Sequence, residues 1–296
     1  MCRGAPRLTF DLPPAAATIG LPMVLGNAQF GEVILCEQYS SAKVDPAQPE
    51  RVAVKSIDTH VMQRRLAAGE TSEDPMQEIE VYAKVRAAGN HPNIVACEDV
   101  RASNHVVELV MEFCDQGDLW THLSKQPESR LDEQDALRKF EQVARGLDFL
   151  HREIGVAHRD LSPENVLLHD GECKIADFGL SISTTARPSD TVGKWYYMAP
   201  EVAAGREYDP VQADMWSLGV ILFIMLTGAP LVERAHVSNK AFNAFCLWGL
   251  ERFLTDWGMI DLFQRSTIDL CQRLLQVLPS ARITMEEVLK HPALCR

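Results

Sequence analysis

Three oxygen-bearing side chains in the stretch VAHRDLSPENVLLHDGECKIADFG have types and spacing that could do chemistry: Asp160, Asn165 and Asp177. An Asp-Gly pair flanked by β-like runs separates Asn165 from Asp177, and such a pair is a strong hairpin signal. Because a hairpin brings its ends together, Asn165 and Asp177 should lie side by side. Carboxylate and amide oxygens suit a hard divalent cation. Asp160, on the preceding loop, is placed to accept a proton from a hydroxyl.

A second group of residues lies in the first third of the chain. Lys55 stands in the apolar run VAVK, where a lysine needs an anionic partner, and Glu78 is placed to supply it, with Glu80 as the alternative. Upstream, residues 26–33 (GNAQFGEV) form a glycine-bearing turn whose backbone N–H groups could approach phosphates. Together the two groups predict a charge-neutralising site for phosphoryl transfer.

The elements that must position these residues change in type along the chain. Alternating and β-branched patterns predict strands, and apolar spacing of three to four residues predicts helices. The predicted strands cover residues 31–39, 51–57 and 105–114, and the predicted helices cover 75–86, 132–154 and 284–290. The uncharged run 215–232 is bounded by Asp214 and Glu233, and we expect a buried core helix there rather than a membrane span.

Composition narrows the function classes. The chain has 296 residues, a formal net charge of −12 and no block of basic residues, which argues against a nucleic-acid partner. The 8 cysteines contain no C-x-x-C pair, so neither a zinc site nor a thioredoxin-like motif is indicated. We expect no membrane partner and a reducing compartment, the cytoplasm with the nucleus as the alternative. The sequence makes no prediction of oligomeric state.

In their order along the chain, these motifs resemble the eukaryotic protein kinase domain, serine/threonine type, over residues 20–293. The resemblance implies an α+β, two-lobed fold, with a β-rich N-lobe (20–113) that carries one main helix. A larger α-helical C-lobe (114–293), an ATP cleft between the lobes and an N-terminal extension (1–19) complete it. It also implies an enzyme that uses ATP and Mg²⁺ to phosphorylate Ser/Thr hydroxyls of protein substrates.

The resemblance assigns roles to individual residues. Asp160, Lys55, Glu78 and Asn165 would serve catalysis, and Asn165 and Asp177 would bind the metal. Glu201 would pair with Arg282, and Asp214 would brace the catalytic loop, residues 158–165. The nucleotide-binding residues would be Gly26, Ala28, Gly31, Val33, Ala53, Lys55, Met111, Glu112, Cys114, Asp118 and Leu167.

Three positions depart from the family's pattern. Ala28 replaces the middle glycine of the loop, and we expect it to tune activity. Ser162 stands where serine/threonine kinases usually have a lysine, and Lys194 stands where they usually have a threonine that contacts that lysine. We predict a swap, in which the Lys194 ammonium lies near Asp160 and the transferred phosphate and serves catalysis. The alternative is a Lys194 that points to solvent in a slow enzyme.

The usual phosphorylation site of the family coincides with Asp190, opposite Arg159. A carboxylate there could partly replace a phosphate. The alternative is that Asp190 is a turn residue and that Thr191 or Ser189 is the phosphorylated switch.

Two other functions compete with an active protein kinase. A pseudokinase scaffold that binds nucleotide and partners would explain Ser162 and Ala28, but it gives no reason for the remaining catalytic set. A small-molecule kinase is disfavoured by the APE and DMWSLG motifs. Trp195 and Met198 are expected to line an apolar pocket for the residue after the acceptor.

Overall fold

The computed structural model describes residues 23–38 and 50–295 and separates into two compact units. Unit 1 contains the described residues up to Thr71 and the segment Ala96–Phe113, and unit 2 contains Ser72–Val95 and everything from Cys114 onward. The predicted N-terminal extension and the last residue of the predicted strand 31–39 lie outside the described residues.

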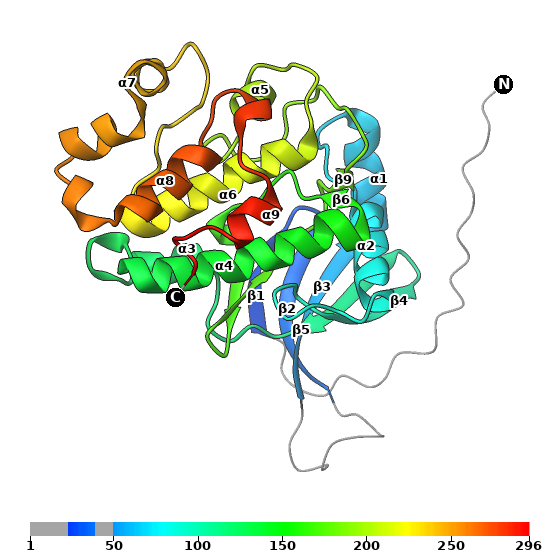
Figure 1. Cartoon of the computed structure of the whole chain (residues 1–296). Helices are drawn as coiled ribbons and strands as arrows, with labels where there is room; N and C mark the ends of the chain where they lie inside the picture. Colours follow the sequence, from blue (N-terminus) through cyan, green and yellow to red (C-terminus); the bar gives the residue numbers. More distant parts are fainter. Residues whose placement is uncertain (1–22, 39–49, 296) are drawn as a thin grey trace. The chain divides into compact units, whose positions relative to one another are not determined.

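Unit 1 is an antiparallel sheet with the strand order β1-β2-β3-β5-β4 (Figure 1). It also contains one helix, which directly follows β3 in the chain. Val52, Val54 and Val110 are at most 4% exposed and pack with Cys36, so one face of the central strands is apolar. The strands are β1 (Met23–Ala28), β2 (Gly31–Gln38), β3 (Glu50–Asp58), β4 (Cys97–Ser103) and β5 (Val106–Glu112), and the helix is α1 (Thr59–Ala68). The three predicted strands are confirmed as β2, β3 and β5.

Sequence reasoning missed helix α1. It begins directly after β3, where the Asp58 side chain accepts hydrogen bonds from the backbone of His60 and Val61. This cap is local and satisfies the first free N–H groups of the helix. Arg65 of α1 donates to the Gln29 carbonyl at 2.8 Å, so the helix supports the turn between β1 and β2.

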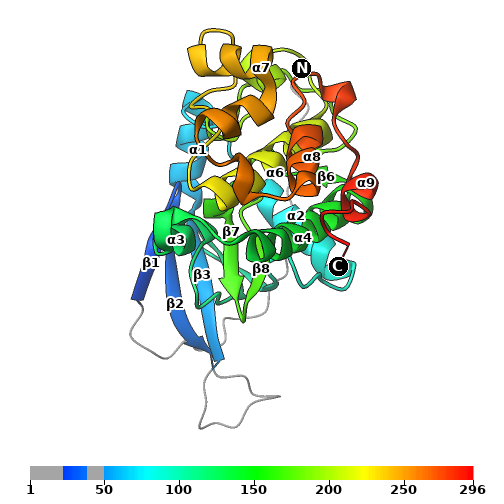
Figure 2. The ribbon, with the colours of Figure 1, turned by 60° about the vertical axis from the view of Figure 1, so that its left-hand side comes forward.

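Unit 2 is mainly helical, and Figure 2 shows α4, α6 and α8 side by side. The helices of eight or more residues are α2 (Pro75–Ala87), α4 (Glu133–Phe149), α6 (Pro210–Thr227), α7 (Lys240–Asp256) and α8 (Arg265–Leu274). The shorter helices are α3 (Leu119–Ser124), α5 (Pro200–Ala203) and α9 (Met285–Leu289), and a π-helical turn, Leu150–Ile154, extends α4. Thus the predicted helices 75–86, 132–154 and 284–290 are confirmed as α2, α4 with its π turn, and α9.

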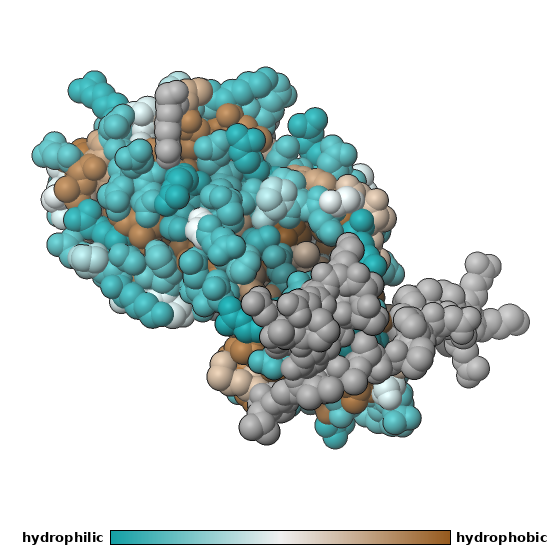
Figure 3. Space-filling view, turned by 90° about the horizontal axis from the view of Figure 1, so that it is seen from below, coloured by the Kyte–Doolittle hydropathy of each residue, from teal (hydrophilic) through white to brown (hydrophobic). Residues whose placement is uncertain are grey.

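Helix α6 is buried on all sides. It begins after the cap Asp209 with Pro210 at its first position, and it ends at Gly228, which adopts the left-handed conformation. Its apolar residues pack against α4 and α8, which confirms the expected core helix. On the face shown in Figure 3, hydrophilic residues cover most of the described surface, with small hydrophobic areas between them.

Two short pairs of strands complete unit 2. β6 (Val156–Ala157) pairs with β9 (Ile182–Ser183), and β7 (Val166–His169) pairs with β8 (Glu172–Ile175) in a hairpin. The Asp-Gly turn joins β7 to β8, with positive φ at both residues, so the predicted hairpin is confirmed.

Residues 72–95 belong to unit 2, although they lie within the predicted N-lobe. The Asp74 N–H donates to the Gly179 carbonyl at 2.8 Å, and the Tyr82 ring packs edge-on against Phe178 with 5.0 Å between centroids. These contacts explain why α2 belongs to the helical unit rather than to the unit that contains the sheet.

Candidate active site

The β7–β8 hairpin brings the two predicted metal ligands together. Val166 pairs with Ile175, and the Ala176 N–H donates to the Asn165 carbonyl at 2.9 Å. Asp177 therefore starts one residue from the backbone of Asn165, as the sequence predicts. Its φ of 64° lies in the left-handed region, which is uncommon for a residue with a side chain and frequent at functional sites.

Asp160 is oriented by Asn165. The Asn165 Nδ2 donates to both the Asp160 carbonyl and Oδ2, each at 2.8 Å. Because the amide nitrogen is used in this way, the Oδ1 of Asn165 is the atom that can bind a cation. The side chain of Asp160 is 17% exposed, so its carboxylate is shielded yet accessible to a hydroxyl.

Asp214 of α6 holds the catalytic loop through two hydrogen bonds to its backbone. Its Oδ2 accepts from the His158 N–H at 2.7 Å, and its Oδ1 accepts from the Arg159 N–H at 2.8 Å. These bonds fix Arg159 at φ 66°, a conformation that costs on the order of 1–3 kcal/mol unless the surroundings determine it. The predicted brace is therefore present, and it starts from the most buried helix of the unit.

His151 is part of the same brace, and sequence reasoning missed it. Its Nε2 lies 2.8 Å from Asp214 Oδ2, and its side chain is 5% exposed. The two residues are 63 positions apart, and a lone histidine at the end of a helix carries no signal for this contact.

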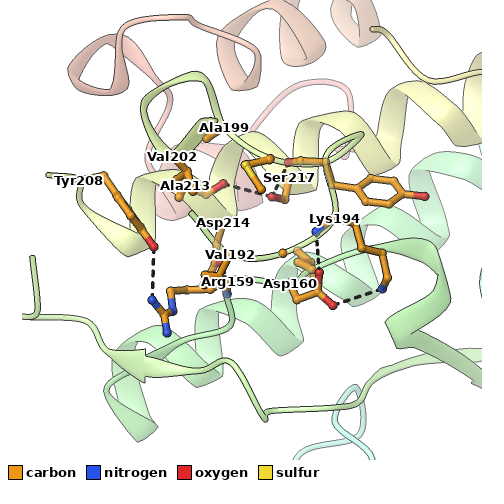
Figure 4. A pocket seen from close by; sticks show the side chains of 14 residues that line it. Arg159, Asp160, Val192, Lys194, Ala199, Val202, Tyr208, Ala213, Asp214 and Ser217 are labelled. Carbon is orange, nitrogen blue, oxygen red and sulfur yellow. Dashed lines mark hydrogen bonds and ion pairs between the residues drawn. The ribbon is translucent and has the colours of Figure 1, made fainter. Parts of the chain in front are cut away.

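The activation segment, residues 177–201, returns to the catalytic loop at Gly193. A Cβ at this position would lie 2.6 Å from the Arg159 carbonyl, and φ is +90°, so only glycine allows so close an approach. Directly after it, the Lys194 N–H donates to Asp160 Oδ1 at 3.0 Å (Figure 4).

The Lys194 side chain also turns toward the catalytic loop. Its Nζ lies 3.2 Å from Asp160 Oδ2 and 2.8 Å from Ser162 Oγ. Ser162 is fully buried. The contact expected from the swapped residue types is present, and Lys194 does not point to solvent.

Asp190 faces Arg159, as predicted. Arg159 Nη1 donates to Asp190 Oδ1 at 3.1 Å and to Oδ2 at 2.9 Å, while its Nε donates to the Leu180 carbonyl. Tyr208 contacts the same guanidinium at 3.4 Å, and burial raises the pKa of its phenol, which therefore stays neutral. The Thr191 hydroxyl donates to the Val202 carbonyl at 3.1 Å.

The predicted pair of Glu201 and Arg282 is present and buried. Arg282 donates from Nη1 and Nη2 to the two carboxylate oxygens at 2.6 and 2.7 Å. The Arg282 side chain is fully buried, and it also donates to backbone carbonyls at Gln212 and Gln276. This pair fixes the end of the activation segment to the core of unit 2.

Of the two residues expected to line an apolar pocket, Met198 lines one and Trp195 does not. Met198 is 5% exposed and lines the pocket of Figure 4. Trp195 is 42% exposed and lies beneath the guanidinium of Arg234, which is 3.7 Å from the ring centroid. Tyr197 is buried beside Glu164, and both burial and this carboxylate raise the pKa of its hydroxyl.

The predicted nucleotide-binding residues are divided between the units. In unit 1, β1 carries Gly26 and Ala28, β2 carries Gly31 and Val33, β3 carries Ala53 and Lys55, and β5 carries Met111 and Glu112. Lys55 lies between Val33 and Leu109 in the sheet. Gly31 of β2 pairs with β3 so closely that a Cβ would lie 2.1 Å from the Ser56 carbonyl, so this position also requires glycine.

Unit 2 carries the other predicted nucleotide-binding residues, Cys114, Asp118 and Leu167, and the predicted catalytic residue Glu78. Glu78 is 2% exposed on α2. Its pairing with Lys55 stays a prediction, because the two residues belong to different units. The backbone of Asp118 forms an isolated antiparallel β-bridge with Leu167. Its carboxylate caps α3 by accepting from the Thr121 N–H at 2.7 Å, a role that sequence reasoning did not predict.

The donor set of Asn165 and Asp177 fits magnesium. Both offer oxygen atoms, the ligands that hard divalent cations prefer, and the hairpin brings the two residues together. Mg²⁺ needs only one or two protein ligands when phosphate oxygens supply others.

Comparison with known proteins identifies the family of this chain. The family model described as the protein kinase domain matches residues 21–294, so the chain belongs to the protein kinase domain family.

Among curated proteins, the chain is similar to three plant and yeast kinases. It is 36% identical to CBL-interacting protein kinase 20 of Oryza sativa subsp. japonica over 90% of this chain and 55% of that protein. It is 33% identical to calcium-dependent protein kinase 12 of Arabidopsis thaliana, over 92% and 52% of the two chains. It is 31% identical to serine/threonine-protein kinase CHK1 of Saccharomyces cerevisiae, over 93% and 51%. The chain thus spans about half the length of these relatives.

Proposed function

We propose that this chain is an active protein kinase that transfers the γ-phosphoryl group of ATP to Ser/Thr hydroxyls of protein substrates. One observation carries the proposal: the Asp160 carboxylate is held by Asn165 beside the hairpin end that presents Asp177. A base and two cation ligands in one rigid cluster are what phosphoryl transfer requires from a protein. The relatives named as serine/threonine or calcium-dependent kinases support the same reaction.

In the proposed reaction, the acceptor hydroxyl oxygen forms a bond to the γ-phosphorus of ATP. The bond from that phosphorus to the β–γ bridging oxygen breaks, and its electron pair stays on ADP. Asp160 accepts the hydroxyl proton, and Asn165 keeps the carboxylate oriented toward the acceptor. Mg²⁺, held by Asn165 and Asp177, would neutralise charge on the phosphate oxygens.

The acceptor class follows from the chain's own segments and from its relatives. The catalytic loop lacks the Ala-Ala-Arg run of tyrosine kinases, and one relative is named a serine/threonine kinase. We further propose that the substrate's residue after the acceptor contacts Met198 beside Trp195. The free thiols of the described cysteines support a reducing compartment, for which we propose the cytoplasm.

The test is magnesium-dependent transfer of labelled phosphate from ATP to a generic protein substrate, followed by phosphoamino-acid analysis. Asp160→Asn keeps the shape of the side chain but removes the base, and we expect it to lose transfer by about 100-fold or more. Lys290→Met is the matched control, because Lys290 directly follows α9, is 73% exposed and pairs with Glu286 alone among the described residues. A wild type that binds ATP without any transfer would favour the scaffold function instead.

A further inference from the structure

The ammonium of Lys194 occupies a position that its sequence neighbours do not explain. It lies 3.2 Å from one oxygen of Asp160 (Figure 4), and Ser162 Oγ is 2.8 Å away, while the Lys194 side chain keeps 39% of its surface exposed. A surface lysine gains little from such an arrangement, because ordering its long side chain costs about 1.5–2 kcal/mol in entropy. The arrangement therefore needs a reason in the site itself.

Backbone geometry delivers this lysine to the site. A Cβ at Gly193 would lie 2.6 Å from the Arg159 carbonyl, so the segment runs close to the loop here, and the next N–H donates to Asp160 Oδ1 at 3.0 Å. Both ends of Lys194 are thus attached to one carboxylate, the backbone to Oδ1 and the side chain to Oδ2. The activation segment supplies these contacts, and the catalytic loop receives them.

The charges around Asp160, the proposed base, also point to Lys194. Among the residues that the structure describes, Lys194 is the cation that pairs with Asp160, since the guanidinium of Arg159 is engaged by Leu180 and Asp190. Position 162, two residues after the base in the loop, holds a buried hydroxyl instead of a charge. A cation at this place neutralises the charge that develops on a transferred phosphoryl group, an effect that mutagenesis puts at about 100-fold or more for one group.

We propose that Lys194, carried by the activation segment, is the cation that stabilises the phosphoryl group during transfer. The proposal rests on the proposed kinase function and deepens it. It makes the position of the segment part of the catalytic chemistry, because displacing the segment removes a charge from the site.

A second contact controls this placement. Asp190 binds Arg159, and Lys194 binds Asp160, so two points four residues apart on the segment attach to adjacent residues of the loop. The ion pair of Asp190 with Arg159 needs no phosphate. The segment can therefore deliver its cation in the unphosphorylated protein.

The first experiment compares wild type with Lys194→Met and Lys194→Arg, with Lys290→Met as control. We expect Lys194→Met to lower kcat by about 100-fold with little change in KM for ATP, and Lys194→Arg to keep part of the activity. Calorimetry with Mg²⁺ gives a readout besides turnover: the Kd of ADP should be unchanged. In Lys194→Met, the affinity for an ATP analogue with an uncleavable β–γ bond, relative to the affinity for ADP, should fall by about tenfold.

The second experiment moves the charge to the loop. In Ser162→Lys/Lys194→Thr the cation no longer depends on the segment, and we expect kcat to recover at least tenfold over Lys194→Met. Asp190→Ala should then lower kcat by about threefold in the wild-type background and by less than that in the double variant. If the double variant does not fold, Lys194→Arg and the nucleotide preference decide.

Each outcome has a clear meaning. A Lys194→Met kcat within about twofold of wild type would overturn the proposal while leaving the kinase function intact. So would a loss of kcat with an unchanged nucleotide preference and faster amide exchange in residues 189–194, since this is the signature of a merely structural lysine. If wild type itself transfers no phosphate, the proposed function fails, and the role proposed for Lys194 in transfer fails with it.

Discussion

Replacement of Glu201 by Gln is the prediction whose magnitude follows most directly from the structure. The change keeps the size of the side chain but removes the negative charge opposite Arg282, whose own side chain is fully buried. Leaving one charge of a buried pair without its partner costs about 3–5 kcal/mol. Because Arg282 keeps its bonds to the carbonyls of Gln212 and Gln276, we take the lower end, about 3 kcal/mol.

This free energy converts to a measurable shift. At about 2.1 cal/mol/K per residue, unfolding of 296 residues carries an entropy of about 0.6 kcal/mol/K near the midpoint. A loss of about 3 kcal/mol therefore lowers Tm by about 5 °C.

Scanning calorimetry of Glu201→Gln, Arg282→Met and the double variant Glu201→Leu/Arg282→Met is the assay. The double variant should be more stable than the sum of the single losses predicts, because it leaves no buried charge behind. A Tm shift below about 1 °C for Glu201→Gln, or strict additivity in the double variant, would refute the reasoning that the pair is buried and mutually dependent.

Two of the three further predictions concern the catalytic loop, and the third concerns a partly buried histidine. Gly193→Ala should lower kcat by more than tenfold with little loss of Tm, because an added Cβ would force the activation segment away from the Arg159 carbonyl; transfer assays and melting curves measure the two effects, and an active variant would contradict the close approach. Asp214→Asn should impair transfer in the same assay, since one amide cannot accept from both backbone N–H groups and His151; normal kcat would show that the loop holds itself. Burial of His91 lowers its pKa, so stability that needs the neutral ring is present above a pH of about 6.5 and declines as pH falls below it. Urea midpoints near pH 7 and pH 5.5 should therefore differ more in wild type than in His91→Gln, and an equal difference would contradict this role.

The sequence predicts much of the fold because its strongest signals are local. The Asp-Gly turn, the apolar strands and the amphipathic stripe of α4 each depend on neighbours within a few residues, and all three appear where expected. Helix α1 was missed because only the cap at Asp58 marks its start, and no break in polarity separates it from β3.

The site is predicted less evenly, for a physical reason. Opposite changes at Ser162 and Lys194 allowed their contact to be foreseen, since a missing charge and an extra charge compensate each other. His151 and Arg234 could not be foreseen, because their partners lie dozens of residues away and one histidine or arginine has no pattern. Asp118 shows a different limit, since an expected ligand contact gives no warning that the same carboxylate also caps a helix.

The reactivity of the buried thiols reports local opening of the structure. Burial raises the pKa of Cys173 in β8 and of Cys271 in α8 to about 12 each, so neither is an effective nucleophile while the surrounding structure is closed. Cys246 and Cys295 are exposed and accessible from the start. An alkylating reagent will therefore label the exposed pair first, and the delayed labelling of Cys173 and Cys271 will time two separate events: opening of the hairpin that carries Asn165, and release of the helix packed on α6.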